Sequence, residues 1–383
     1  MNLIRKYFPI IFFVFSFLIF LKTFFLQTYP DFLVHYYSPI ALLTGHSPYY
    51  SYNNIPFFPD VYPPVTILFF FPSVLFSLFL SEKIWFVISL VSLFLSVYFS
   101  FKIFNKNLFS WLGFIILGLI FLSFPVKFSF GMGQVNALIL FLTTFSIFLY
   151  TKKKTVTSSL VLCLSIAMKF FPIFFPLYFL LIKKWKYFFS FLLLFLFIHL
   201  LIFIIYPSLV IDFYTKIIFS LIGGWKTDYY NQSLTGFIGR ITLNQPFRES
   251  LRIATSLFFV LVTFFAILKT KGKEKFLHFH LSVLITLNLI VNSFSWQHHF
   301  VFMIYPFIVF LFYFLDSKNY KALIILFVSY LLISFNFKNP ENFSPLLTSN
   351  VLYGAVLFWG LQIFILLRSS LKLQVNLPKD KIR

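Results

Sequence analysis

Long apolar segments, separated by short polar ones, make up most of the chain. Twelve of them are long enough to enter a bilayer, and segments of this length and apolarity are typical of transmembrane helices. They cover residues 7–26, 63–80, 84–104, 108–124, 134–150, 156–182, 187–206, 251–268, 277–293, 300–315, 321–335 and 347–367. The pattern therefore predicts an all-α polytopic membrane protein.

Two of these segments contain breaks that affect how often the chain crosses the membrane. The segment at 63–80 contains three prolines, so we expect a re-entrant or juxtamembrane helix pair that does not cross. The segment at 156–182 is interrupted at Lys169–Pro172, so we expect two short crossing helices with Lys169 at their apex. This interpretation gives about 12 transmembrane helices with both termini in the cytoplasm. The alternative is that 63–80 and 156–182 each cross once, and counts of about 11 and about 12 helices both stay open.

Composition and charge support a membrane protein and exclude other classes. The chain is 60% hydrophobic and only 11% charged, which is too apolar for a soluble protein of 383 residues. Its 31 Lys and Arg residues outnumber its 10 Asp and Glu residues, but the bases lie in short clusters between apolar segments. That placement follows the positive-inside rule and argues against binding to nucleic acid. The single cysteine excludes a disulfide framework.

The basic clusters also predict which polar segments face away from the cytoplasm. We expect one integral-membrane domain over residues 1–383, with a large first non-cytoplasmic loop at 27–64 and a second outer loop at 207–250. The tail at 368–383 is expected in the cytoplasm. Since the polar residues concentrate in the outer segments, the chemistry is expected at the non-cytoplasmic surface of the cell (plasma) membrane. The first apolar segment lacks a small-residue cleavage site and is expected to be a retained helix.

Asp31 is the acidic residue that follows the first apolar segment, five positions after its last residue. A partly desolvated carboxylate at this place suits a general base for a sugar hydroxyl. Asp31 could equally be the N-cap of a helix over 32–43. Glu82 follows a serine before the next apolar segment and is expected near a helix start.

Two further polar motifs interrupt apolar segments on the same predicted face. Gly131-Met-Gly133-Gln134-Val-Asn136 opens an apolar segment, and its amides could cap a helix or bind sugar hydroxyls. No Gly-Lys-Ser/Thr follows, so it is not a phosphate loop. The ammonium of Lys169 must either reach the interface or find an anion, and the proline that follows favours an anion.

The second outer loop and a later helix end carry the remaining candidates. Asn231–Gly236 with Arg240 combines amides, hydroxyls and a guanidinium that suits phosphate, although a solvated loop remains an alternative. His298 and His299 follow Ser295-Trp-Gln and point to different faces of a helix, which favours hydrogen bonding over metal binding. Outer carboxylates are sparse, so no metal is expected.

These motifs, in this order, resemble those of the polyprenyl-phosphate-sugar-dependent integral-membrane glycosyltransferases of the GT-C class, and within it glycosyltransferase family 87. The motifs are Asp31 with Tyr36-Tyr37, Gly45-His-Ser-Pro48-Tyr49, Val61-Tyr62-Pro63-Pro64, Gly133-Gln-Val-Asn136, Lys169-Phe-Phe-Pro172 with Lys183-Lys-Trp-Lys186, Asn231-Gln-Ser-Leu234 and Ser295-Trp-Gln-His298-His299. The departure is His35, where a small or apolar residue is expected before the tyrosine pair.

The resemblance implies a GT-C fold and an inverting hexosyltransferase. Such an enzyme moves a hexose, commonly mannose, from a polyprenyl-phosphate sugar to a lipid or glycan acceptor, with no cofactor. It implies that Asp31 deprotonates the acceptor hydroxyl, because that is the role of the aspartate in the first outer loop. The implied donor-phosphate ligands are Lys169, Arg240, His298 and His299. The implied sugar or acceptor ligands are Tyr36, Tyr62, Gln134, Asn136, Asn231 and Gln232.

Two other functions are weighed against the transferase. A transporter or lipid flippase usually shows repeated halves and charged or broken helices near the midplane. Here no repeat is visible by eye, and the polar residues lie at helix ends on one predicted face. An O-antigen polymerase or ligase also has large outer loops, but typically relies on Arg and His there, with no obligatory Asp after the first helix.

Overall fold

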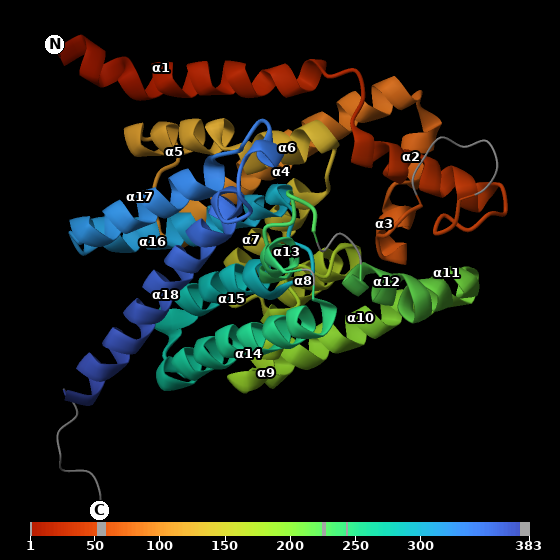
Figure 1. Ribbon diagram of the computed structural model, residues 1–383. Helices are drawn as coiled ribbons and strands as arrows, with labels where there is room; N and C mark the ends of the chain where they lie inside the picture. Colours follow the sequence, from red (N-terminus) through yellow and green to blue (C-terminus); the bar gives the residue numbers. More distant parts are fainter. Residues whose placement is uncertain (1, 52–58, 224–226, 243, 376–383) are drawn as a thin grey trace, which may run out of the picture. The chain divides into compact units, whose positions relative to one another are not determined.

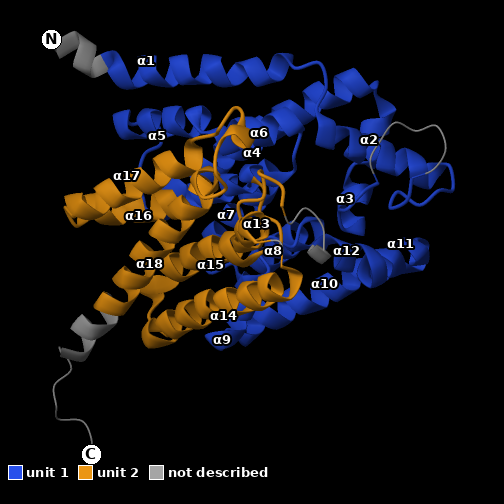
Figure 2. Cartoon of the chain, in the orientation of Figure 1, with its two compact units in different colours: residues 1–224, 297–305 blue, residues 225–296, 306–383 orange. Residues whose placement is uncertain are grey.

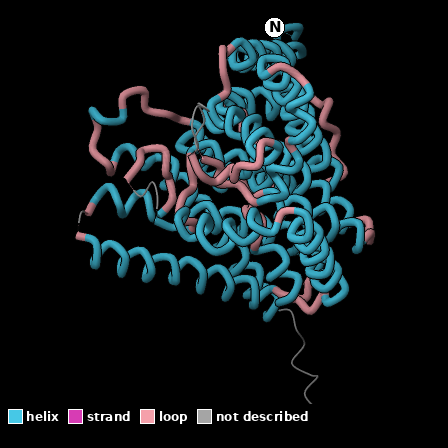
Figure 3. Tube along the Cα trace, turned by 90° about the vertical axis from the view of Figure 1, so that its right-hand side faces the viewer, coloured by secondary structure: helices cyan, strands magenta, loops and turns pink. Residues whose placement is uncertain are grey.

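The chain is helical throughout the part that the structure describes. The computed structural model describes residues 2–51, 59–223, 227–242 and 244–375, and no strand occurs within these ranges (Figure 3). The predicted all-α class is therefore confirmed. Parts of the predicted outer loops (52–58, 224–226 and 243) and of the predicted tail (376–383) lie outside the described residues.

Seven helices among the described residues are long and apolar enough to cross a membrane, which confirms a membrane protein. They are Tyr7–Phe25, Leu78–Ile103, Trp185–Ile205, Gln245–Thr270, Glu274–Val291, Gln297–Asp316 and Leu347–Arg368. The pair Trp111–Leu122 and Phe124–Met132, bent by 58°, raises the number to eight if it is one span. Four shorter apolar helices accompany them. The expected count of about 12 crossings stays a prediction.

The chain divides into two compact units (Figure 2). Unit 1 contains residues 1–224 and 297–305, and unit 2 contains residues 225–296 and 306–383. The prediction of one membrane domain over residues 1–383 stays a prediction. We describe each unit by itself.

Unit 1 is a set of helices that pack in pairs, of which some are consecutive and others are distant in the sequence (Figure 1). Helix α1 packs along α5, α4 along α7, and α8 along both α7 and α10. The described helices of unit 1 are α1 (Asn2–Leu21), α2 (Pro30–Leu43), α3 (Pro64–Phe69), α4 (Leu78–Ile103), α5 (Trp111–Leu122), α6 (Phe124–Met132), α7 (Asn136–Thr151), α8 (Thr155–Met168), α9 (Phe174–Leu181), α10 (Trp185–Ile205), α11 (Pro207–Asp212) and α12 (Ile218–Gly223). The 3-10 segment η5 (Gln297–Met303) also belongs to this unit and packs on α6 and α7.

Both predicted helix breaks are present. In the proline-containing segment, α3 ends at Phe69, a 3-10 turn follows at Phe71–Leu75, and α4 begins only at Leu78. In the second segment, α8 ends at Met168 and α9 begins at Phe174, with Lys169 in an extended conformation between them. Pro172 explains this break, because proline excludes its predecessor from helical geometry and has no N–H to donate.

The first polar loop is largely helical. Helix α2 begins with Pro30 at its first position, where a proline sacrifices no helical hydrogen bond, and Asp31 lies in the first turn. The N-cap residue is Tyr29, so the alternative that Asp31 caps a helix over 32–43 is wrong. A carboxylate in the first turn still interacts favourably with the positive end of the helix dipole.

Glu82 is not at the start of its helix, and that expectation is wrong. The N-cap of α4 is Ser77, whose hydroxyl accepts from the N–H of Leu80. Glu82 lies further inside the helix and is buried. One of its carboxylate oxygens accepts a hydrogen bond from the N–H of Tyr29 at 2.9 Å. Glu82 therefore supports the N-terminus of α2 from a neighbouring helix.

Unit 2 is a second helical cluster, arranged around one long helix. Helix α18 (Asn350–Val375) packs with α14 (Gln245–Thr270), α15 (Leu277–Val291) and α17 (Tyr320–Ser334). The remaining helices are α13 (Leu234–Ile241) and α16 (Ile304–Asp316), and the first two residues of α16 are assigned to unit 1.

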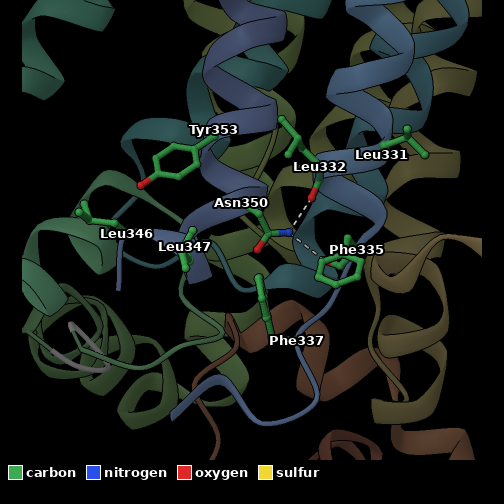
Figure 4. Close-up of a pocket in the computed structure, with 8 residues that line it drawn as sticks. All are labelled: Leu331, Leu332, Phe335, Phe337, Leu346, Leu347, Asn350 and Tyr353. Atoms are coloured by element: carbon green, nitrogen blue, oxygen red, sulfur yellow. Dashed lines mark hydrogen bonds between the residues drawn. The ribbon is translucent and has the colours of Figure 1, made fainter. Parts of the chain in front are cut away.

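A mainly apolar cavity of about 500 Å³ lies where α17 and α18 meet (Figure 4). Asn350 donates hydrogen bonds from its amide to the carbonyls of Leu332 and Phe335, at 2.7 and 3.0 Å, which closes the end of α17. The lining residues are Leu331, Leu332, Phe335, Phe337, Leu346, Leu347, Asn350 and Tyr353.

Candidate active site

Five predicted site residues meet in unit 1, where they form one polar cluster around Gln134. Asp31 comes from α2, Tyr62 precedes α3, Gln134 and Asn136 lie at the junction of α6 and α7, and Lys169 follows α8. We call Asp31, Tyr62, Gln134, Asn136 and Lys169 the Gln134 cluster. Four different parts of the chain therefore supply its polar groups.

Gly133 allows α2 to approach the α6–α7 junction closely. It ends α6 in the left-handed conformation, with φ 73°, which glycine adopts without strain. A Cβ at this position would lie 2.7 Å from the Cβ of Phe32 and 2.9 Å from that of Tyr29. The indole N–H of Trp85 donates to the Gly133 carbonyl at 2.8 Å and holds the turn in place. The missing side chain therefore lets Asp31 reach Gln134.

Gln134 connects the acidic and basic members of the cluster. Its amide N–H donates to Oδ2 of Asp31. Its amide oxygen accepts from the hydroxyl of Tyr62 at 2.6 Å and from the ammonium of Lys169 at 3.3 Å. Because the carboxylate can only accept and the ammonium can only donate, these contacts determine which way the amide points. Asp31 and Lys169 are thus held at opposite ends of one buried amide.

Lys169 is oriented by neutral oxygens. Its ammonium donates to Oδ1 of Asn136 at 2.7 Å, in addition to Gln134, and lies 5.4 Å from the centroid of the Tyr62 ring. Burial lowers the pKa of Lys169 to about 7, and the charge of Asp31 opposes this shift. A bound anion would stabilise the charged form of this side chain.

Asp31 is half-buried at the edge of the cluster. Burial raises its pKa above the usual range for an aspartate, while the hydrogen bond from Gln134 and the charge of Lys169 act in the opposite direction. A raised pKa makes a carboxylate a stronger base. This environment suits proton abstraction better than a solvated position would.

Asp60 and Ser38 hold Tyr62 in place, and sequence reasoning assigned neither of them a role. The hydroxyl of Ser38 donates to one oxygen of Asp60 at 2.6 Å, and the N–H of Tyr62 donates to the other at 2.7 Å. Burial raises the pKa of Asp60 to about 6. The feature of the sequence that could have identified Asp60 was its position in the same predicted outer loop as Asp31.

Glu82 and Lys83 support the segment just before Asp31, and sequence reasoning also missed this pair. Besides the contact from Tyr29 to Glu82, Lys83 donates to the carbonyls of Phe24 and Leu26 at 2.7 and 3.0 Å. The signal was a pair of opposite charges directly before an apolar segment.

His298 and His299 lie in unit 1 beside Asn136. The amide N–H of Asn136 donates to the carbonyl of His298 at 3.2 Å. Both histidines are buried, and their rings are perpendicular, with centroids 4.5 Å apart. Lys169 is close enough to interact electrostatically with both. The structure therefore brings the predicted histidines and the predicted lysine into one region.

Tyr36 makes its polar contact elsewhere. Its hydroxyl donates to the carbonyl of Phe76, which precedes α4, at 2.9 Å. Five residues after Asp31, it lies on a different face of α2. Its predicted contact with a sugar stays a prediction.

The comparison with protein families assigns the chain to a class of enzyme. A family model described as Glycosyltransferase family 87 matches residues 61–293, which is more than half of the chain. The chain belongs to glycosyltransferase family 87. A search of curated proteins finds no match. Tyr62, Gln134, Asn136 and Lys169 lie within the matched range, whereas Asp31 precedes it.

Membership of glycosyltransferase family 87 makes the protein a membrane-embedded transferase that acts on a sugar donor and an acceptor. It confirms the resemblance carried by the sequence motifs. It also favours a sugar transferase over a transporter, a flippase, or an O-antigen polymerase or ligase.

The three remaining predicted ligands of the glycosyltransferase form a cluster within unit 2. Arg240 donates to the carbonyls of Asp228 and Asn231, both at 2.7 Å, and to the hydroxyl of Ser349 at 2.9 Å. Gln232 is buried and donates to the carbonyls of Tyr229 and Thr348. These contacts show that Arg240 and Gln232 organise the loop before α13.

Asn231 ties that loop of the glycosyltransferase to the end of α15. Its amide oxygen accepts from the hydroxyl of Ser233 at 2.8 Å and from the N–H of Ser295 at 3.1 Å. Its amide N–H donates to the Ser293 carbonyl at 3.1 Å. That Arg240 binds phosphate, and that Asn231 and Gln232 bind sugar or acceptor, stay predictions.

The described part of the glycosyltransferase contains no group of side chains suited to a metal ion. Within these residues, no three His, Cys, Asp or Glu side chains come together in a way that could hold an ion. The expectation that no metal or cofactor takes part stays a prediction.

Proposed function

We propose that this glycosyltransferase moves a hexose, with mannose as the first candidate, from a polyprenyl-phosphate sugar to a lipid or glycan acceptor. The reaction takes place on the non-cytoplasmic side of the cell membrane and inverts the anomeric centre. The proposed fold is GT-C, with about 12 crossings. One observation carries the proposal: Gln134 holds a carboxylate with a raised pKa at one end of its amide and an ammonium at the other.

The acidic end of the cluster suits the acceptor. Among the described residues, Gln134 binds Oδ2 of Asp31, and Oδ1 is the oxygen left for a hydroxyl group. In the proposed step, Asp31 takes the proton of the acceptor hydroxyl as its oxygen forms a bond to C1 of the donor hexose. A single displacement of this kind has one carboxylate base and no covalent sugar–enzyme intermediate.

The basic end suits the leaving group. The bond between C1 and the phosphate oxygen breaks, and its electron pair leaves with the polyprenyl phosphate. Negative charge therefore grows on phosphate, where the Lys169 ammonium can stabilise it, with His298 or His299 as a further ligand. Gln134 and Asn136 orient Lys169 without neutralising it, because both accept through uncharged oxygens.

Because Gln134 separates the two charges, they can act on different groups. A direct ion pair between Asp31 and Lys169 would weaken the base and occupy the cation. With the amide between them, each charge stays available for its own substrate. Tyr62 and Asn136 line the same cluster and are placed to contact the transferred sugar.

Sugar transfer from a defined donor tests this function. Membranes containing the wild-type enzyme would receive polyprenyl-phosphate mannose labelled in the sugar, and incorporation into lipid and glycan fractions would be measured. We expect Asp31→Asn to abolish labelling at normal expression. Asp212→Asn is the matched control, because Asp212 is not part of the Gln134 cluster and forms an ion pair with the exposed Lys216 at 2.7 Å.

Three outcomes contradict parts of the proposal. Equal labelling by wild type and Asp31→Asn removes Asp31 as the base. Labelling only from another polyprenyl-phosphate hexose replaces mannose but keeps the reaction class. Transfer from a nucleotide sugar, and from no polyprenyl-phosphate donor, overturns the donor class.

A further inference from the structure

His35 is a buried histidine one helical turn after Asp31. Its side chain is 1% exposed. The ring stacks in parallel on Phe70, with centroids 4.4 Å apart and an interplanar angle of 4°, and meets Tyr62 edge-on at 4.6 Å. This is also the position where the sequence departs from the small or apolar residue expected before the tyrosine pair.

The two ring nitrogens of His35 are unsatisfied within the described part of the chain. Among the described residues, neither Nδ1 nor Nε2 has a hydrogen-bond partner, although both are buried. Buried polar groups in native proteins are nearly always paired, and each exception calls for an explanation. If the ring only filled space between Phe70 and Tyr62, a phenylalanine would serve without this cost.

The ring lies at the edge of the Gln134 cluster. Residues four apart share one face of a helix, so His35 follows Asp31 on the same face of α2, about 6 Å along the axis. The Tyr62 ring that His35 meets also lies against the Lys169 ammonium. His35 therefore borders the Gln134 cluster through its contact with Tyr62.

We propose that His35 determines acceptor specificity by hydrogen-bonding a polar group of the acceptor next to the hydroxyl that Asp31 deprotonates. The inference rests on the proposed function. A neutral imidazole offers one donor and one acceptor, which matches the hydroxyl groups of a sugar or polyol. A spacing of about 6 Å between the two residues can be bridged by a single monosaccharide unit.

The protonation state fits hydrogen bonding and not proton transfer. Burial and the charge of Lys169 lower the pKa of His35 to about 3, so the ring stays neutral at physiological pH. A ring with this pKa does not compete with Asp31 as the base. Its role is therefore to position the acceptor.

The test compares His35→Phe with wild type in purified enzyme. Phenylalanine keeps the contacts with Phe70 and Tyr62 but removes both nitrogens. We expect KM for an alkyl mannoside acceptor to rise at least tenfold, while KM for the polyprenyl-phosphate donor stays within twofold. Tm should stay equal or rise, because the unpaired nitrogens are gone. His35→Gln should restore part of the acceptor affinity, and the exposed His46→Phe should match wild type.

Binding separates this inference from the proposed function. The alkyl mannoside should raise the Tm of wild type but not of His35→Phe, and this shift does not require turnover. If the alkyl mannoside raises the Tm of wild type but not of His35→Phe, and no sugar is transferred from the polyprenyl-phosphate donor, the result counts against the proposed function and supports acceptor binding by His35. A lower Tm with unchanged acceptor KM shows a structural residue and overturns the inference. Equal acceptor-induced shifts in both enzymes, or none in wild type, also overturn it.

Discussion

The pH dependence of donor use follows from the environment of Lys169. Its pKa is lowered to about 7, so its charge is complete at acid pH and is lost as the pH rises through neutrality. At pH 8 about one tenth of the side chains carry a charge, and at pH 9 about one hundredth. If the ammonium holds the donor phosphate, kcat/KM for the donor should fall about 16-fold between pH 7 and 8.5 and more above it.

The acid side of the profile should report Asp31. Burial raises the pKa of this carboxyl, and a base must be deprotonated, so activity should fall as the pH drops through that raised value. Together the two groups predict a bell-shaped profile. The donor is a phosphodiester and carries one negative charge over this range, so it does not itself produce the descending limb.

Lys169→Arg is the decisive variant. Arginine keeps its charge at every pH in the assay, so the descending limb should move to higher pH, even if the maximum rate is lower. The measurement is kcat/KM for labelled polyprenyl-phosphate mannose between pH 5 and 9.5, with the surface variant Lys216→Arg as control. A descending limb unchanged in Lys169→Arg, or no decline at all above pH 7 in wild type, would refute this account of donor binding.

Two stability predictions concern the supports of the site, and thermal unfolding in one detergent measures both. Gly133→Ala should lower the free energy of unfolding by more than the roughly 1–2 kcal/mol that a left-handed alanine costs, because the new Cβ would also lie 2.7 Å from the Cβ of Phe32. Gly45 has φ 79° and open space around it, so Gly45→Ala should lower the free energy of unfolding only by the cost of the left-handed backbone. Equal losses in the two variants would contradict the argument that Gly133 is needed for the close approach of α2. Asp60→Asn should stabilise the protein at pH 8 by up to about 3 kcal/mol. The folded pKa of Asp60 is raised to about 6, so its ionisation destabilises the fold as the pH rises from about 4 through 6. The gain should disappear near pH 4, and a gain independent of pH would contradict this reasoning.

Local chemistry explains which features could be predicted from the sequence. The breaks near Lys169 and in the proline-containing segment were predictable, because proline limits the backbone wherever it stands. Asp31, Gln134 and Lys169 could be selected as polar exceptions within apolar segments. That the Gln134 amide would join Asp31 to Lys169 was not predictable, since Asp31 and Gln134 are 103 positions apart in the sequence.

Other features depend on packing that a single sequence does not reveal. Helix α2 starts at Pro30 and not at Asp31. Glu82, which lies in another helix, accepts a hydrogen bond from the N–H of Tyr29. His298 bonds Asn136 through its backbone carbonyl, so its residue type says nothing about that contact. The cavity of α17 and α18 depends on how two helices meet, and it left no recognisable motif.

Unit 1 is formed by two segments that are separated in the sequence, and this has a consequence for biosynthesis. Residues 297–305 complete this unit, yet the ribosome makes them only after residues 225–296. Until then, the amide of Asn136 lacks the His298 carbonyl that it binds in the finished protein. The nascent chain must therefore hold its first helices in the membrane in an incomplete state while the intervening ones are inserted. A chain that stops before residue 297 contains Asp31 and Lys169 but lacks the His298 carbonyl that Asn136 binds, so unit 1 is completed only late in synthesis.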